Sequence, residues 1–371
     1  MKIICKKSEL NSALLSLCRI VPTRTNMPIL SGCLLEAAEQ TLTLQCTDQE
    51  INLKLTIPAR VEEEGAVVVA ARHLSDLLRR IESDEISISW SSENNLLLMN
   101  YGSAESSFFT WYANEFPGME KDKAENSITF AGDKWKKATA KVITAAAQQD
   151  VRVNYAGVYV RFEDEKIQMA ATDGYRLAFF DTPNTTSVSN GALFIPVKAL
   201  TEVNRLAADN VDLQISWDES SISFQGNDFK LISRLINIQF PDYKKVIPKD
   251  PELKIEITRD VLLTTLERAS LFVSADEHYA IACLNVEGDN LAVTAQASEL
   301  GSLLENISLQ EPAVKKCKAS FNARYLLDPL QVMDKEKVTL CLNGESGPAV
   351  YLEDDDQDFY LHLISPVCRA G

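Results

Sequence analysis

Cationic side chains recur at a constant spacing along this 371-residue chain. Arg72, Lys198 and Arg324 lie 126 residues apart, each in a segment whose apolar residues have helical spacing. In the first segment, residues 70–81, the apolar residues form one helix face, and Arg72 lies on the opposite face. One such face alone is most often simply solvated, but its repetition favours a surface that attracts phosphate groups.

The segment 132–147 carries a denser version of the same pattern. Lys134, Lys137 and Lys141 have the spacing i, i+3, i+7, and Trp135 falls on the other side of the predicted helix. Arg205 adds another cation seven residues after Lys198. A sparse lining of this kind predicts weak, salt-sensitive binding to phosphates without sequence preference.

The charge is distributed unevenly. The formal net charge of −16 argues against nucleic acid as a partner when taken as a whole. The predicted helices, however, contain 14 Lys/Arg and 9 Asp/Glu, so they carry +5 and the remainder carries −21. These helical segments are 8–21, 71–82, 132–147, 196–208, 258–273 and 321–335. A basic set of helices on an acidic protein is compatible with helices that face a polyanion.

Catalytic and metal-binding patterns are missing from the sequence. It contains no Walker A loop and no GxGxxG, GxSxG or HExxH motif. Asp173 beside Tyr175 and Arg176 could act as an acid–base group, but no nucleophile or ligand set accompanies it. The eight cysteines form no CxxC and the three histidines are isolated, which predicts buried thiols. We expect a non-enzyme without catalytic residues, cofactor or metal.

The repeat extends over the whole chain. Each third reads as a helix, two strands, a polar dipeptide, a second helix and another strand pair. The dipeptides are Thr47-Asp48, Thr172-Asp173 and Ser298-Glu299. A period of about 125 residues is too long for a solenoid, and predicts an α+β fold of three tandem domains. We expect domains at 1–122, 123–250 and 251–371, joined by Pro-bearing linkers at 114–126 and 239–252.

The sequence also predicts a cytoplasmic protein without a membrane partner. No apolar run reaches the ~18 residues of a membrane span, and the N-terminus lacks the hydrophobic region of a secretion signal.

Several motifs resemble those of the bacterial DNA polymerase III beta subunit, the sliding-clamp family, and the resemblance covers the whole chain. They are MPIL at 27–30, AQQDVR at 147–152, ATDGYRLA at 171–178, FPDYKKVIP at 240–248 and SPVCR at 365–369. The resemblance implies three DNA-clamp domains, with two chains closing head-to-tail into a homodimeric ring around duplex DNA. It also implies a non-catalytic processivity factor, cytoplasmic and associated with the nucleoid.

The resemblance further implies three sets of site residues. For DNA, family positions match Arg24, Arg72, His73 and Gln149, beside the cations that the helices suggest: Lys134, Lys137, Lys141, Lys198, Arg205 and Arg324. A pocket for partner peptides would comprise Arg152, Tyr155, Thr172, Gly174, Tyr175, Arg176, Leu177, Pro241, Lys245, Val246, Ile364, Ser365, Pro366 and Val367. The dimer seam would comprise Phe108, Phe109, Leu271 and Phe272. The implied partners are a clamp loader, replicative and translesion polymerases and mismatch-repair proteins, recognised through short peptide motifs.

Another class of protein fits the composition. An acidic three-domain scaffold that binds proteins and never encircles DNA would have the same repeats and cores. Retention on circular DNA separates the two interpretations, since a scaffold has no reason to stay on a closed circle.

Overall fold

The computed structural model describes residues 1–118, 124, 126–147, 155–163, 166–183, 191–274, 279–355 and 357–367. Within these ranges the chain forms six α-helices, two in each third. They are α1 (Lys7–Ile20), α2 (Ala71–Leu78), α3 (Gly132–Ile143), α4 (Val197–Leu206), α5 (Arg259–Ala269) and α6 (Ala323–Val332). All six predicted helices are therefore confirmed, with ends that differ by a few residues. No described helix is long and apolar enough to cross a membrane.

The strands pair antiparallel in three sheets. In the described residues, the largest sheet has the order β10 (Asn126–Ala131), β15 (Asp212–Trp217), β16 (Ser221–Gln225), β17 (Phe229–Arg234), β4 (Ile51–Pro58), β3 (Thr41–Thr47), β2 (Gly32–Ala38), β6 (Gly65–Ala70), β9 (Ala104–Tyr112), β8 (Leu96–Tyr101), β7 (Glu85–Ser91), β1 (Lys2–Lys6) and β5 (Arg60–Glu63).

The second sheet has the order β14 (Gly191–Pro196), β11 (Gly157–Phe162), β12 (Lys166–Thr172), β13 (Arg176–Pro183), β25 (Phe359–Ile364), β24 (Ala349–Asp354), β23 (Lys337–Leu342) and β18 (Leu253–Thr258). The third has the order β21 (Gly301–Ser308), β20 (Asn290–Ala297), β19 (Ile281–Glu287) and β22 (Cys317–Asn322).

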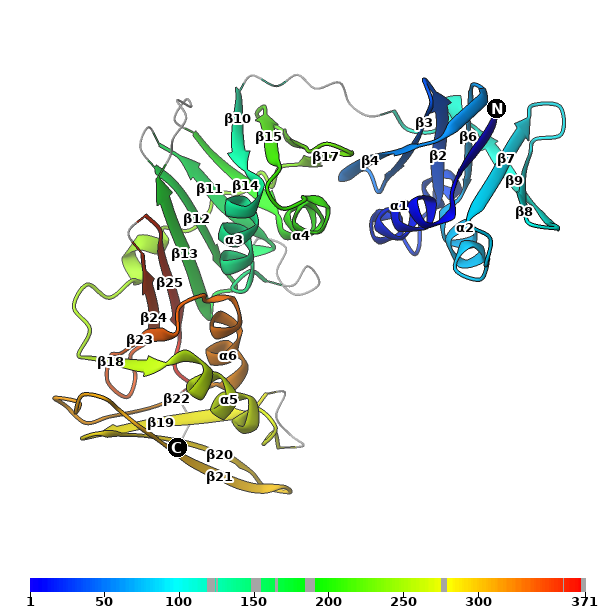
Figure 1. Cartoon of the computed structure of the whole chain (residues 1–371). Helices are drawn as coiled ribbons and strands as arrows, with labels where there is room; N and C mark the ends of the chain where they lie inside the picture. The colour runs from blue at the N-terminus through cyan, green and yellow to red at the C-terminus, as the bar shows by residue number, and fades with distance from the viewer. Residues whose placement is uncertain are drawn as a thin grey trace. The chain divides into compact units, whose positions relative to one another are not determined.

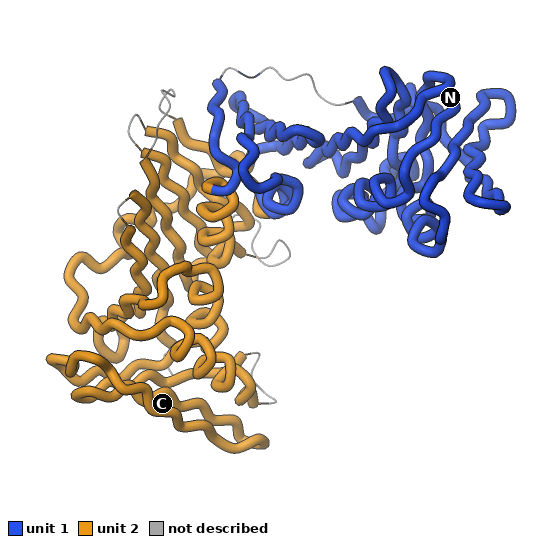
Figure 2. Tube along the Cα trace, in the orientation of Figure 1, with its two compact units in different colours: residues 1–133, 198–235 blue, residues 134–197, 236–371 orange. Residues whose placement is uncertain are grey.

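Two sheets run across the borders between the sequence repeats. β4 of the first third pairs with β17 of the middle third, and β13 of the middle third pairs with β25 of the last. The chain accordingly divides into two compact units, one of residues 1–133 and 198–235 and one of 134–197 and 236–371 (Figure 2). Backbone hydrogen bonds, and not only linkers, therefore join successive repeats.

Helix pairs cover one face of the sheets. α1 packs against α2 in the first unit, and α5 packs against α6 in the second (Figure 1). Leu10, Leu14 and Leu17 of α1 are fully buried, as are Leu74 and Leu78 of α2. Their spacing is the helical period that the sequence shows, so apolar burial against the sheet fixes which helix face is left outside.

Some elements were not predicted. A short strand precedes the first helix of each repeat, namely β1, β10 and β18, and five or six residues carry too little periodicity to detect. The segment 239–252 is more than a linker, because Tyr243 is buried in a core cluster there and the Phe240 ring stacks on Tyr159 at 5.1 Å. Pro329 lies inside α6, and although proline commonly kinks or shortens a helix, α6 is as long as α4.

His362 in β25 makes the stability of the fold pH-dependent. Burial lowers the pKa of its imidazole to about 3, with a smaller effect of Arg176, and its Nδ1 lies 3.1 Å from the Tyr360 hydroxyl. The unfolded chain therefore binds a proton near pH 6.5 that the folded chain does not. We expect this group to cost ~1.4 kcal/mol of stability per unit as pH falls below 6.5. Urea denaturation between pH 7 and 4.5 should show that His362→Phe loses stability less steeply than the parent; parallel curves would contradict this.

Candidate functional site

Most helix cations that the sequence assigned to DNA have partners inside the molecule. Lys198 of α4 forms an ion pair with Asp48, which follows β3, and Arg205 pairs with the buried Glu202. The Arg72 Nη2 donates a hydrogen bond of 2.7 Å to the Val21 carbonyl. Such contacts hold the cations in place and reduce the charge that remains for an external anion.

The prediction that Lys141 faces DNA together with Lys134 and Lys137 is wrong. Its side chain is 3% exposed and pairs with Glu353 of β24, itself 5% exposed, as well as with Asp334 at 3.2 Å. Glu353 Oε1 also accepts the backbone N–H groups of Asp334 at 2.8 Å and Lys335 at 2.9 Å. Burial would raise the pKa of Asp334, but Lys141 and Lys137 beside it lower that pKa. Lys141 is therefore part of the core and is not available to DNA.

The remaining predicted cations differ in their exposure and in whether an acidic side chain lies beside them. Lys137 lies 3.3 Å from Asp334, so its charge is already shared. Arg324 of α6 is exposed, with Asp328 at 3.9 Å. Arg24, His73 and Lys134 are also exposed and have no ion pair with any residue that the structure describes. Two predicted positions, Gln149 and Arg152, lie outside the described residues.

The TDGYR motif forms a tight turn between β12 and β13. The Thr172 Oγ1 accepts from the Gly174 N–H at 3.0 Å, and the Asp173 Oδ1 accepts from the N–H groups of Tyr175 and Arg176. Gly174 has φ = 90°, a conformation that glycine adopts without strain. The turn holds Tyr175 exposed at its tip.

Arg176 joins this turn to α6. Its Nε lies 3.0 Å from Asp173, its Nη1 donates to Asp328 at 2.6 Å, and its guanidinium stacks on the Tyr325 ring at 4.3 Å. Three contacts on a half-buried guanidinium fix its orientation. The acid–base alternative for Asp173 gains no support, because its carboxylate is used by the turn and by Arg176.

Leu177, one of the residues predicted to form the peptide pocket, offers no open surface. It is only 2% exposed and packs in the cluster with Phe179, Tyr243 and Leu363. The apolar surface available beside it comes from Tyr175 and from Val246, which is 57% exposed. Pro241 and Lys245 are also exposed, and Lys245 pairs with Asp242 at 3.0 Å.

The C-terminal segment runs along the same turn. Ile364 is buried and opposite Arg176 in the β13–β25 ladder, and the Ser365 N–H donates to the Tyr175 carbonyl at 2.8 Å. Val367 N–H then donates to the Ser320 carbonyl at 2.7 Å, with Pro366 between them. The structure thus brings together three segments, residues 172–177, 241–246 and 364–367, which we call the tail site. Among the described residues, no hydrogen bond or ion pair links the half-buried Tyr155 to the tail site; the Tyr155 carbonyl accepts the Ala147 N–H at 3.1 Å.

The residues predicted for the dimer seam lie on a strand in the first third of the chain and directly after a helix in the last third. Over residues 104–109, β8 is the only described strand that pairs with β9, and Phe109 there is 87% exposed. At the other end of the chain, β21 is an outermost strand, and Leu271, which follows α5, is 70% exposed. Phe108 and Phe272 are partly exposed. Exposed apolar side chains beside an unpaired edge are typical of an interface.

The fold defines a class: a protein of three tandem α+β repeats, each with two helices and antiparallel strands. Family models of the DNA polymerase III beta subunit match its three thirds in order: the N-terminal domain at 1–120, the central domain at 129–242 and the C-terminal domain at 244–367. The chain belongs to the DNA polymerase III beta subunit family, the sliding clamps.

Known sliding clamps are similar to this chain along its full length. The chain is 26% identical to the beta sliding clamp of Synechococcus elongatus, with 94% of this chain and 95% of that protein covered. It is also 26% identical to that of Staphylococcus epidermidis, with 97% and 96% covered. The sliding clamp of Pseudomonas aeruginosa bound to griselimycin superposes with a TM-score of 0.90 at 25% identity, covering 99% of each chain. That of Bacillus subtilis gives a TM-score of 0.90 at 23% identity, again with 99% of each covered. These matches support the clamp over the scaffold interpretation.

Proposed function

We propose that this protein closes with a second copy into a ring around duplex DNA and tethers DNA polymerase to its template. The three domains would end near residues 122, 250 and 371. The observation that carries the proposal is a pair of exposed apolar side chains, Phe109 on β9 in the first third of the chain and Leu271 after α5 in the last third. Because these two surfaces differ, copies would join head-to-tail, and such contacts make a ring when the rotation closes. A protein that encircles DNA would work at the nucleoid, in the cytoplasm.

The weak cationic surface supports a topological hold on DNA. Lys198, Arg205 and Lys137 already have acidic partners, and Lys141 is buried. Free cations such as Arg24 and Lys134 give only a few phosphate contacts, so direct affinity would be low and salt-sensitive. A closed ring does not need tight contacts, and loose contacts leave it free to slide.

The experiment that tests the ring uses one DNA in two forms. The protein is placed on nicked circular DNA by a clamp loader and then washed at high salt. We expect it to stay on the circle, because salt screens charges but does not open a ring. Cutting the same circle with a restriction enzyme should release it from the ends. Equal loss from both forms at high salt would refute encirclement and favour the scaffold.

The tail site would receive the short peptide motifs of the clamp loader, of replicative and translesion polymerases and of mismatch-repair proteins. Tyr175 and Val246 offer exposed apolar surface for a Leu or aromatic anchor. Arg176 stays held by Asp328 and Tyr325 and would serve as a fixed polar wall. The Ser365–Val367 segment would close one side, since the Ser365 N–H ties it to the turn and the Val367 N–H ties it to β22.

Val246→Asp should separate peptide binding from folding. Because Val246 is mostly exposed, aspartate there leaves the fold intact, yet it places a charge where an apolar anchor would dock. We expect affinity for a polymerase-derived motif peptide to fall by about 30-fold, roughly 2 kcal/mol. Fluorescence polarisation measures the affinity, with Val314→Asp, at another exposed valine outside the tail site, as the control. Unchanged affinity would move the site away from Val246. Leu177→Asp is not a suitable test of peptide binding, because Leu177 is buried and aspartate there would disrupt the core.

A further inference from the structure

The first border between repeats copies the backbone of the tail site. Arg234 N–H donates to the Glu50 carbonyl at 2.9 Å, as Ser365 N–H donates to the Tyr175 carbonyl at 2.8 Å. The Gln49 N–H donates to the Thr47 Oγ1 at 2.9 Å, the counterpart of the bond within the TDGYR turn. The ladders match as well, since Ile232 lies opposite Asn52 as Leu363 lies opposite Leu177. The same scaffold for binding is therefore present twice.

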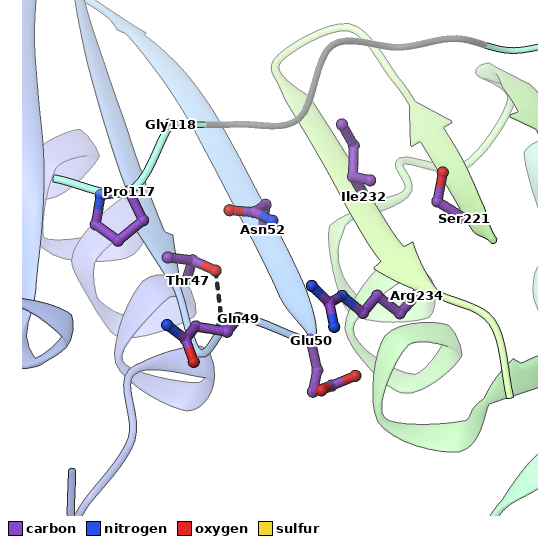
Figure 3. A pocket seen from close by; sticks show the side chains of 9 residues that line it. All are labelled: Thr47, Gln49, Glu50, Asn52, Pro117, Gly118, Ser221, Ile232 and Arg234. Atoms are coloured by element: carbon purple, nitrogen blue, oxygen red, sulfur yellow. Dashed lines mark hydrogen bonds between the residues drawn. The ribbon is translucent and has the colours of Figure 1, made fainter. Parts of the chain in front are cut away.

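The first copy encloses a pocket where the tail site has a filled core. The pocket holds about 300 Å³, at the small end of the range for ligand sites. We call it the first-junction pocket. Its lining consists of Thr47, Gln49, Glu50, Asn52, Pro117, Gly118, Ser221, Ile232 and Arg234 (Figure 3). Asn52 replaces Leu177, and Arg234 replaces Ser365. The copied backbone thus carries an amide where the tail site has an apolar leucine, and a cation where it has a serine hydroxyl.

Two groups in this pocket lack partners among the described residues. The Asn52 Oδ1 is buried and accepts no hydrogen bond, although a buried acceptor normally has a donor. The Arg234 guanidinium has neither an ion pair nor a hydrogen bond there, although its planar fork suits a carboxylate. Gln49, at the rim, has φ = 76° where the tail site has Gly174, so this turn is kept at a conformational cost.

We propose that the first-junction pocket binds a short polar peptide segment that bears a carboxylate. The carboxylate would pair with Arg234, and an amide N–H of the peptide would satisfy the Asn52 Oδ1. Glu50 on the same rim disfavours a run of acidic residues and selects a segment with a single acid. The pocket would give the clamp a second contact for partners whose apolar motif occupies the tail site. The peptide class of ligand rests on the proposed function of the tail site; the polar chemistry rests on the pocket itself.

Isoleucine methyl groups allow both sites to be tested at once in the full-length protein. Ile232 lines the first-junction pocket, and Ile364 lies in the tail site. In methyl NMR, acetyl-Gly-Asp-Gly-amide should shift the Ile232 signal saturably, whereas the neutral acetyl-Gly-Asn-Gly-amide should not. Acetyl-Ser-Leu-Phe-amide should shift Ile364 instead. A shift of Ile364 alone would refute the pocket and leave the tail site standing, and a shift of Ile232 alone would do the reverse.

Substitutions identify the groups responsible. Arg234→Gln and Asn52→Leu should each weaken binding of the acidic peptide by about tenfold or more, since each removes one of the two polar contacts. Arg60→Gln is the matched control, because Arg60 is exposed in the same unit, pairs with Glu62 and lies outside the pocket. Full affinity in Arg234→Gln, or no shift of Ile232 up to about 10 mM peptide, would overturn the proposal.

Discussion

Replacing Lys141 by methionine should destabilise the protein by about 3–5 kcal/mol, the largest effect that we expect from any single helix cation. Lys141 and Glu353 are both almost fully buried and pair with each other. Methionine preserves much of the side-chain volume but leaves the Glu353 carboxylate in the core without its counter-ion. Urea denaturation at pH 7, monitored by circular dichroism, measures the loss of stability in the unfolding transition of the second unit.

Two companion variants show that the pair, and not simply a lysine of α3, is responsible. Lys134→Met on the exposed side of the same helix should change stability by no more than about 0.5 kcal/mol. In the double variant Lys141→Met/Glu353→Gln, the glutamine oxygen can still accept hydrogen bonds from the N–H groups of Asp334 and Lys335. Part of the lost stability should therefore be recovered. If Lys141→Met and Lys134→Met were equally mild, Lys141 would not be the buried partner described above.

Phe109→Asp should turn the proposed dimer into a monomer. The phenyl ring of Phe109 is almost entirely exposed in one copy, so the substitution costs the fold little, whereas an unpaired charge inside the interface costs several kcal/mol. We expect the dissociation constant of the dimer to rise at least about 100-fold, roughly 3 kcal/mol. Sedimentation velocity over a range of concentrations measures the change.

Val314→Asp is the matched control for this experiment. Val314 is 88% exposed, but it lies outside β9, β21 and the segment that follows α5. It should leave the dimer unchanged. A Phe109→Asp protein that remains dimeric would place the seam at another surface, and Leu271→Asp would then be expected to have no effect either.

Periodicity was sufficient to predict the helices but not the partners of their side chains. The spacing of the leucines in α2 reports which face a sheet must cover, because burial acts residue by residue along one helix. By the same rule Lys141 falls on the polar face of α3, yet Glu353, 212 residues further on, brings it into the core. A helical wheel contains no information about such a partner. Charge counts therefore overstated the cationic surface.

The segments 172–177 and 364–367 could be predicted because family motifs mark both of them, and their contact follows from the β13–β25 ladder. The burial of Leu177 could not be predicted, because Leu177 is covered by Tyr243, which comes from a segment whose sequence is typical of a linker. The aromatic pair Phe240 and Tyr243 within a Pro-rich stretch was the available signal, because solvated linkers seldom carry two large rings. The first-junction pocket needed the register of β4 and β17, which no local pattern provides.

The buried Lys141–Glu353 pair also constrains how this protein can evolve. A lineage that replaces one partner first passes through a protein with a lone charge in its core, so selection would remove most such intermediates. The two positions should therefore change together across descendants, or persist unchanged, while exposed cations such as Lys134 drift independently. Both side chains are buried within one copy of the protein, yet the pair would appear in an alignment as strongly coupled as a binding site.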